Sequence, residues 1–137
     1  ASTFKHLAES GVEMAASWHL KDGTYGIIDP NNKLRPAANV FNWANKYLIG
    51  TVMATQSDRP TLEAIAVSQK DGERSLLLIN KSSVATRVKL QADGQDFSAT
   101  KILNFHLDEK GVTNKVLAKI DAKGLMMQPY SLSLLRL

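Results

Sequence analysis

The chain of 137 residues has no cysteine, few aromatic side chains and no long apolar run. Without cysteine, a disulfide framework and a thiolate metal site are excluded, and the redox compartment stays open. No apolar stretch approaches the roughly 20 residues that a membrane-spanning helix needs, so no membrane partner is expected. The hydrophobic fraction of 44% and the charged fraction of 22% are typical of soluble globular proteins.

Clusters of basic residues are also missing, although the formal net charge is +4. Lysine and arginine are scattered singly, and no run of like charge exceeds a pair. A surface that binds nucleic acid would gather them on one face, with aromatic residues between them. A basic nucleic-acid binder is therefore the weakest of three functional hypotheses, and no nucleic-acid partner is expected.

The common motifs of enzymatic and metal sites are absent as well. The sequence has no glycine-rich phosphate loop, nucleophile elbow or HExxH. His6 and His106 lie far apart without a partner at ligand spacing, so we expect neither a metal nor another cofactor. Asn80-Lys81-Ser82 matches the N-glycosylation triplet, which has meaning only on a eukaryotic secretory route.

The first fifty residues have the pattern helix, strand, helix. A helix is predicted over residues 3–10, and the mostly apolar Val12–Trp18 is typical of a buried parallel strand. A second helix begins at Pro36 and ends before Gly50, with Trp43 off its main apolar stripe and predicted to pack at a domain junction. This order repeats in (β/α) barrels and doubly wound sheets. Because a lone parallel strand has no sheet partner, we expect the chain to be the carboxyl-terminal piece of a longer protein.

After residue 50 the pattern changes to period-two strands separated by hairpin turns such as Asp71-Gly72. Strands are predicted over residues 51–55, 62–68, 75–80, 86–90, 100–105 and 117–120, and within 126–137. Their spacing is that of an antiparallel sandwich. We therefore predict a mostly β fold, in which a helix-strand-helix piece of a (β/α)8 barrel at residues 1–50 precedes an antiparallel β-sandwich at residues 51–137.

Three stretches carry a family resemblance. They are YGIIDPNNKLRPA at residues 25–37, SLLLINKS at residues 75–82 and LMMQPYSLSLL at residues 125–135. In this order, after a strand that ends in Trp18, the chain resembles the carboxyl-terminal end of clan A glycoside hydrolases of the arabinofuranosidase and β-xylosidase type. The family has a glycine where this chain has Asn32, which also tolerates the left-handed region.

The resemblance implies that catalysis needs residues outside this chain. Retaining glycosidases use two carboxylates about 5–5.5 Å apart, and this family places them on the fourth and seventh barrel strands. No catalytic residue is therefore assigned, and the chain alone is expected to be inactive. Glu13 lies at the start of the predicted strand, where barrel residues serve stability. The implied partners are the rest of the barrel, as a missing N-terminal part or a second chain, and a carbohydrate substrate. A secreted or periplasmic location is favoured over a cytoplasmic one.

Trp18 and His19 are the main candidates for substrate binding, since they end the predicted strand where the sugar pocket of a barrel opens. A Trp face stacks on a sugar ring, and a His can hydrogen-bond a hydroxyl. Lys21, Asp22 and Tyr25 follow on the loop and would rim the pocket. The alternative is a core Trp beside a satisfied His.

A free-standing carbohydrate-binding sandwich is the remaining functional hypothesis. Such modules display several aromatic residues on one exposed face. The sandwich half of this chain has only Phe97, Phe105 and Tyr130, which argues against it.

Overall fold

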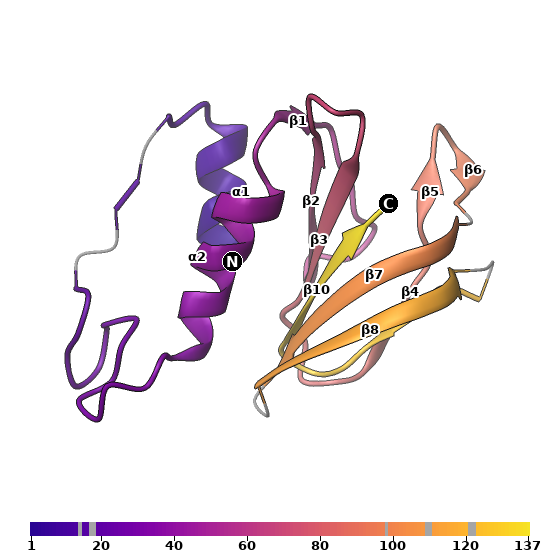
Figure 1. Cartoon of the computed structure of the whole chain (residues 1–137). Helices are drawn as coiled ribbons and strands as arrows, with labels where there is room; N and C mark the ends of the chain where they lie inside the picture. Colours follow the sequence, from indigo (N-terminus) through magenta and orange to yellow (C-terminus); the bar gives the residue numbers. More distant parts are fainter. Residues whose placement is uncertain (14, 17–18, 98, 109–110, 121–122) are drawn as a thin grey trace.

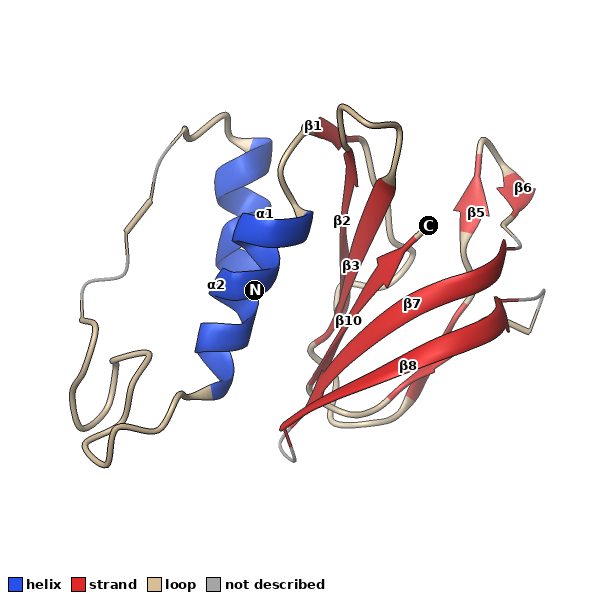
Figure 2. Cartoon of the chain, viewed as in Figure 1, coloured by secondary structure: helices blue, strands red, loops and turns tan. Residues whose placement is uncertain are grey.

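The computed structural model describes residues 1–13, 15–16, 19–97, 99–108, 111–120 and 123–137. Its elements over these residues are α1 (Ser2–Glu9), α2 (Pro36–Tyr47), β1 (Thr51–Met53), β2 (Leu62–Ser68), β3 (Arg74–Asn80), β4 (Thr86–Val88), β5 (Gln91–Ala92), β6 (Gln95–Asp96), β7 (Ala99–Asp108), β8 (Gly111–Ile120), β9 (Leu125–Met127) and β10 (Ser131–Arg136) (Figures 1 and 2). Neither helix in this part of the chain has the length and hydropathy to cross a bilayer.

Six strands form one antiparallel sheet in the order β1-β2-β3-β10-β7-β8. The last strand of the chain thus lies between β3 and β7, with Leu134 opposite Leu77 and also opposite Phe105. Strands this apolar need cover on both faces of the sheet. The two faces are covered by different layers.

The first face is covered by α2. Val40, Trp43 and Tyr47, spaced along one side of the helix, pack on Leu77 and Leu134 of the sheet. This spacing of three and four residues places the three side chains on one helical face. Trp43, only 3% exposed, packs on the sheet.

Phe41, on the same helix, is only half-buried. Its ring meets Phe4 of α1 edge-on, with the ring centroids 5.1 Å apart. Helix α1 thereby packs beside α2 while burying none of its own residues completely.

The second face is covered by the small antiparallel sheet of β4 and β9. Leu78 and Leu135 point to this side and pack with Val88 and Met127. Because side chains alternate along a strand, Leu77 and Leu78 serve opposite layers. Two antiparallel sheets packed face to face fit a β-sandwich, and the mostly β character of the chain is confirmed.

The predicted strand at Val12–Trp18 is wrong over the residues that can be compared. Residues 12, 13, 15 and 16 are exposed and have no strand conformation, and Trp18 lies outside the described residues. Glu13 is therefore exposed and not at the start of a strand. A parallel strand requires hydrogen-bonding neighbours. The helices separate this region from the sheet (Figure 1).

The remaining predictions differ from the structure mainly at boundaries. Helix α2 and strands β2 and β3 begin and end within two residues of their predicted limits, whereas β8 begins six residues before its predicted start at residue 117. The short β5–β6 hairpin has no counterpart among the predicted strands. The division of the chain at residue 50 stays a prediction.

Candidate functional site

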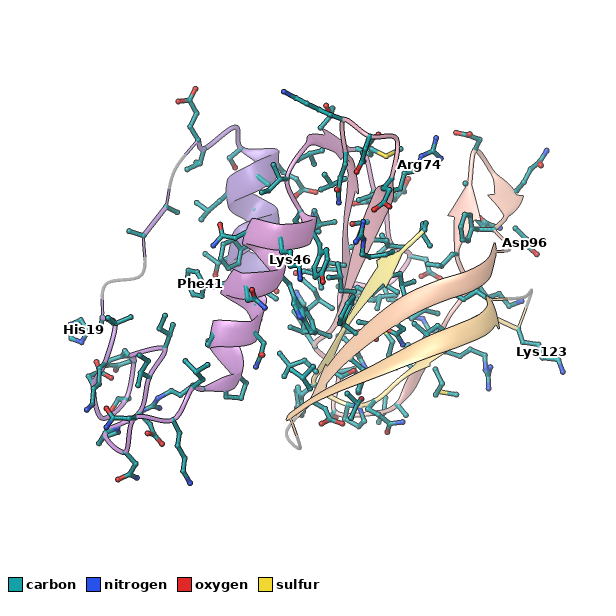
Figure 3. All side chains as sticks on the ribbon, viewed as in Figure 1. His19, Phe41, Lys46, Arg74, Asp96 and Lys123 are labelled. Carbon is teal, nitrogen blue, oxygen red and sulfur yellow. The ribbon has the colours of Figure 1, made fainter. Side chains whose placement is uncertain are left out.

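The loop that joins the two helices contains most of the predicted substrate-binding residues. Residues 19–35 of this loop lie on the side of α2 that faces away from the six-stranded sheet (Figure 1). His19 is at the outer side of this loop, far from the strands (Figure 3). Two short bridges stabilise the loop, a parallel one between Lys21 and Ile28 and an antiparallel one between Ile28 and Leu34.

The carboxylate of Asp22 organises the first turn of this loop. Its Oδ1 accepts hydrogen bonds from the backbone N–H groups of Thr24 (2.8 Å), Tyr25 (2.6 Å) and Gly26 (2.6 Å). Its Oδ2 contacts Nδ1 of His19. The backbone hydrogen bond from Gly26 contributes most to lowering the pKa of Asp22 from 3.8 to about 2. Asp22 is therefore ionised at neutral pH.

Arg35 holds the same turn from its carbonyl side. Its guanidinium donates hydrogen bonds to the carbonyl oxygens of Asp22 (3.0 Å), Gly23 (2.8 Å) and Thr24 (3.2 Å). Arg35 is the residue before the first turn of α2, so these bonds tie the loop to the helix that packs on the sheet. Asp22 thus binds backbone N–H groups of the turn, and Arg35 binds its backbone carbonyl oxygens.

A second turn follows at Asp29. Its Oδ1 accepts the backbone N–H groups of Asn31 and Lys33, both at 2.9 Å. Asn32 has φ of 63°, so this residue does adopt the left-handed region, as its place in the family's glycine position predicted. Lys21 Nζ donates to Asn32 Oδ1 at 2.6 Å and joins the two turns.

The structure brings part of the predicted site together. Asp22 contacts His19 through its side chain and Tyr25 through the backbone. The His19 side chain is 41% exposed, and Tyr25 is 82% exposed. The prediction for Trp18 concerns a residue outside the described ones. The arrangement presents an imidazole and a phenol ring on a hydrogen-bonded turn, which suits hydrogen bonding and stacking to a polyhydroxylated ligand.

A polar group on strands β7 and β10 was not predicted from the sequence. His106 Nδ1 lies 3.3 Å from Ser133 Oγ, and His106 Nε2 lies 3.4 Å from Asp108 Oδ2. These are the residue types of a hydrolytic triad. Ser133 is only 1% exposed, however, so no substrate reaches its hydroxyl. Because His106 and Asp108 are two residues apart on one strand, their side chains lie on the same face of the sheet, and the sequence could have shown this. Ser133 lies beside them only because β10 pairs with β7 in this register.

Other candidates fit structural roles. Asn80 is 2% exposed, and its Nδ2 donates to the carbonyl oxygens of Val84 (3.2 Å) and Gln128 (2.8 Å), so the glycosylation triplet is not accessible in the folded chain. A small apolar hollow of about 80 Å³ between α1, α2 and β2 contains no ionisable group in its lining. Over the described residues, no group of three or more His, Cys, Asp or Glu side chains is placed to hold a metal ion.

Comparisons by sequence give no assignment: no protein family and no curated protein matches the chain. Solved structures do match. An endoxylanase of glycoside hydrolase family 30 from Clostridium papyrosolvens matches 98% of this chain with a TM-score of 0.66 and 13% identity. A β-porphyranase of glycoside hydrolase family 86 from Bacteroides plebeius matches 82% with a TM-score of 0.60 and 13% identity.

The catalytic domain of xylanase C, a family 30 enzyme from Talaromyces cellulolyticus, matches 62% of the chain with a TM-score of 0.51 and 14% identity. This chain spans 36% of the endoxylanase, 22% of the porphyranase and 19% of xylanase C. All three are clan A glycoside hydrolases, the class that the resemblance named. They do not confirm the arabinofuranosidase or β-xylosidase type. At this identity the similarity shows the fold alone.

Proposed function

We propose that this chain is the carboxyl-terminal segment of a clan A glycoside hydrolase. It contributes the last helix-loop-helix part of the catalytic barrel and an accessory β-sandwich. One observation carries the proposal: the match to the family 30 endoxylanase covers 98% of the chain. The similarity therefore extends over the helices and the loop between them as well as the sheets.

Exposed apolar side chains on the helix-joining segment support this assignment. Val12 is 45% exposed, Leu20 66% and Leu34 69%. These residues belong to the segment between α1 and α2, which the helices separate from the sheet (Figure 1). In the proposed enzyme the rest of the barrel covers them, which removes apolar surface from water.

The proposed task of the loop is to bind and orient the sugar. Trp18 and Tyr25 offer ring faces, and His19 offers a hydrogen bond to a hydroxyl group. The two catalytic carboxylates come from the remainder of the protein, because none is assigned in this chain. The finer assignment to the arabinofuranosidase or β-xylosidase type rests on the motif at residues 25–37.

The proposal is tested by comparing the chain with the complete gene product that contains it. We expect no turnover of aryl glycosides or xylan by the 137-residue chain and clear turnover by the complete protein. His19→Ala in the complete protein should raise KM roughly three- to tenfold, since one hydrogen bond to the sugar is lost. Turnover by the chain alone, or a complete protein without glycosidase activity, would contradict the proposal.

A free-standing carbohydrate-binding module has less support. Phe105 is packed between Trp43 and Tyr47, with ring centroids 6.1 and 5.1 Å away. Of the three sandwich aromatics, Tyr130 alone is strongly exposed, at 69%. Retardation of the chain in a polysaccharide affinity gel would favour this module over the glycosidase segment.

A further inference from the structure

We propose that Asp22 is a positioning residue, which fixes the imidazole of His19 with one carboxylate oxygen and the backbone of Tyr25 with the other. This inference rests on the proposed function, because it takes His19 and Tyr25 as the residues that contact the sugar. Asp22 itself touches no substrate. Asp22 determines whether His19 accepts or donates a hydrogen bond to the sugar. It also fixes the position of Tyr25.

The position of Tyr25 depends on its backbone. Its side chain is 82% exposed, so packing contributes little to where the ring lies. The backbone N–H of Tyr25 is 2.6 Å from Asp22 Oδ1, and the neighbouring N–H groups of Thr24 and Gly26 converge on the same oxygen. A carboxylate that collects three N–H groups holds a short turn in one conformation.

The second oxygen determines which nitrogen of His19 carries the hydrogen. Asp22 is ionised at neutral pH and can only accept, so the contact between Oδ2 and Nδ1 requires hydrogen on Nδ1. In the neutral imidazole, Nε2 is then a hydrogen-bond acceptor. We infer that His19 accepts a hydrogen bond from a sugar hydroxyl and does not donate one.

The carboxylate is itself anchored to the protein core. Arg35 binds the carbonyl oxygen of Asp22 at 3.0 Å and stands at the start of α2. The same helix packs on the sheet through Val40, Trp43 and Tyr47. The orientation of the imidazole is therefore set by contacts that reach into the buried core.

The experiment uses Asp22→Asn, which keeps the Oδ1 acceptor and replaces Oδ2 with an amide donor. An amide donor opposite Nδ1 requires a lone pair there, so the hydrogen of His19 should move to Nε2. The tautomer is read by NMR of the 137-residue chain labelled with ¹⁵N-histidine. The chain has three histidines, and His19→Gln assigns the signal.

Asp29→Asn is the matched control. Asp29 also accepts two backbone N–H groups in a turn of the same loop, but those bonds come from Asn31 and Lys33. We expect hydrogen on Nδ1 of His19 in the wild type and in Asp29→Asn, and on Nε2 in Asp22→Asn. Hydrogen on Nε2 in the wild type, or the same tautomer in Asp22→Asn, would overturn the inference. If the isolated chain gives no folded spectrum, the same labelled histidines are measured in the complete protein.

The kinetic consequence separates this inference from the proposed function. In the complete protein, Asp22→Asn should raise KM roughly three- to tenfold with kcat nearly unchanged, because a donor now faces the sugar hydroxyl where an acceptor stood. A switched tautomer with unchanged KM would support the positioning by Asp22 and overturn the sugar contact of His19. An unswitched tautomer would overturn the positioning while leaving the glycosidase assignment intact.

Discussion

Tyr47 stacks on Phe105 with ring centroids 5.1 Å apart, and this contact joins the last turn of α2 to strand β7. The guanidinium of Arg136, on β10, also lies over the Tyr47 ring, 5.0 Å from its centroid. Tyr47 and Phe105 are separated by more than fifty positions in sequence. Their contact links the helix that follows the loop to strand β7 of the sheet.

The first prediction follows from this contact. Tyr47→Ala should lower the free energy of unfolding by about 3 kcal/mol, because a buried aromatic ring is removed from the interface of α2 with the sheet. Asn45→Ala, at an exposed position of the same helix, should change it by less than about 0.5 kcal/mol. Urea denaturation of the three proteins measures both effects. Equal effects of the two substitutions would show that α2 is not packed on the sheet.

The second prediction concerns pH. The folded-state pKa of Asp22 is depressed from 3.8 to about 2, so its ionised form stabilises the fold. This contribution is present above pH 3.8 and is lost as the pH falls toward 2. The stability difference between wild type and Asp22→Asn should therefore be constant from pH 7 to about 5 and shrink at lower pH. Urea unfolding at several pH values measures it, and a difference that grows on acidification would contradict the hydrogen-bonded carboxylate.

The third prediction uses two glycines of the same turn. A Cβ on Gly26 would lie 2.6 Å from the backbone nitrogen of Asp22, whereas a Cβ on Gly23 meets no atom within 4 Å. Gly26→Ala should destabilise the turn by about 1–3 kcal/mol, and Gly23→Ala should have little effect. Amide hydrogen exchange at Thr24 and Tyr25 reports the loosening directly. Similar exchange rates in both variants would mean that the close approach at Gly26 is absent in solution.

The fourth prediction separates the buried polar group from a catalytic triad. Ser133→Ala removes the hydroxyl beside His106 Nδ1 and should cost about 1–3 kcal/mol of stability. Under the proposed function, glycosidase turnover by the complete protein should persist at a temperature where the variant is folded. Thermal unfolding and a turnover assay measure the two effects. A loss of turnover by several orders of magnitude with an intact fold would assign Ser133 a catalytic role.

Local patterns predicted most elements because their causes are local. The strongly apolar run at Ser75–Asn80 and the turn dipeptide Asp71-Gly72 both act through neighbouring residues, and the structure has β3 at Arg74–Asn80. The proline at position 36 marks the start of α2 for the same kind of reason. The strand predicted at Val12–Trp18 failed because an apolar run alone does not supply a neighbouring strand.

The candidate site was predicted as a set of residue types, and its geometry was not. His19 was placed at the end of a strand, and Asp22 and Tyr25 on the loop after it, from their order in the sequence. Only the folded loop shows that the carboxylate of Asp22 contacts both His19 and the backbone of Tyr25. These contacts depend on the turn that ends at Gly26 and on the hydrogen bonds of Arg35. The contact between His106 and Ser133 was also not predictable from the sequence, because it depends on the register of β7 with β10.

The sequence by itself determined where helices begin, where strands turn and which side chains alternate between two faces, because these depend on the conformational preferences of adjacent residues. The tertiary structure decided that β10 inserts between β3 and β7, that α2 covers one face of the sheet, and that Asp22 gathers His19 and the backbone of Tyr25. Strand pairing and side-chain convergence join residues distant in sequence, and their energies arise only when the whole chain is packed.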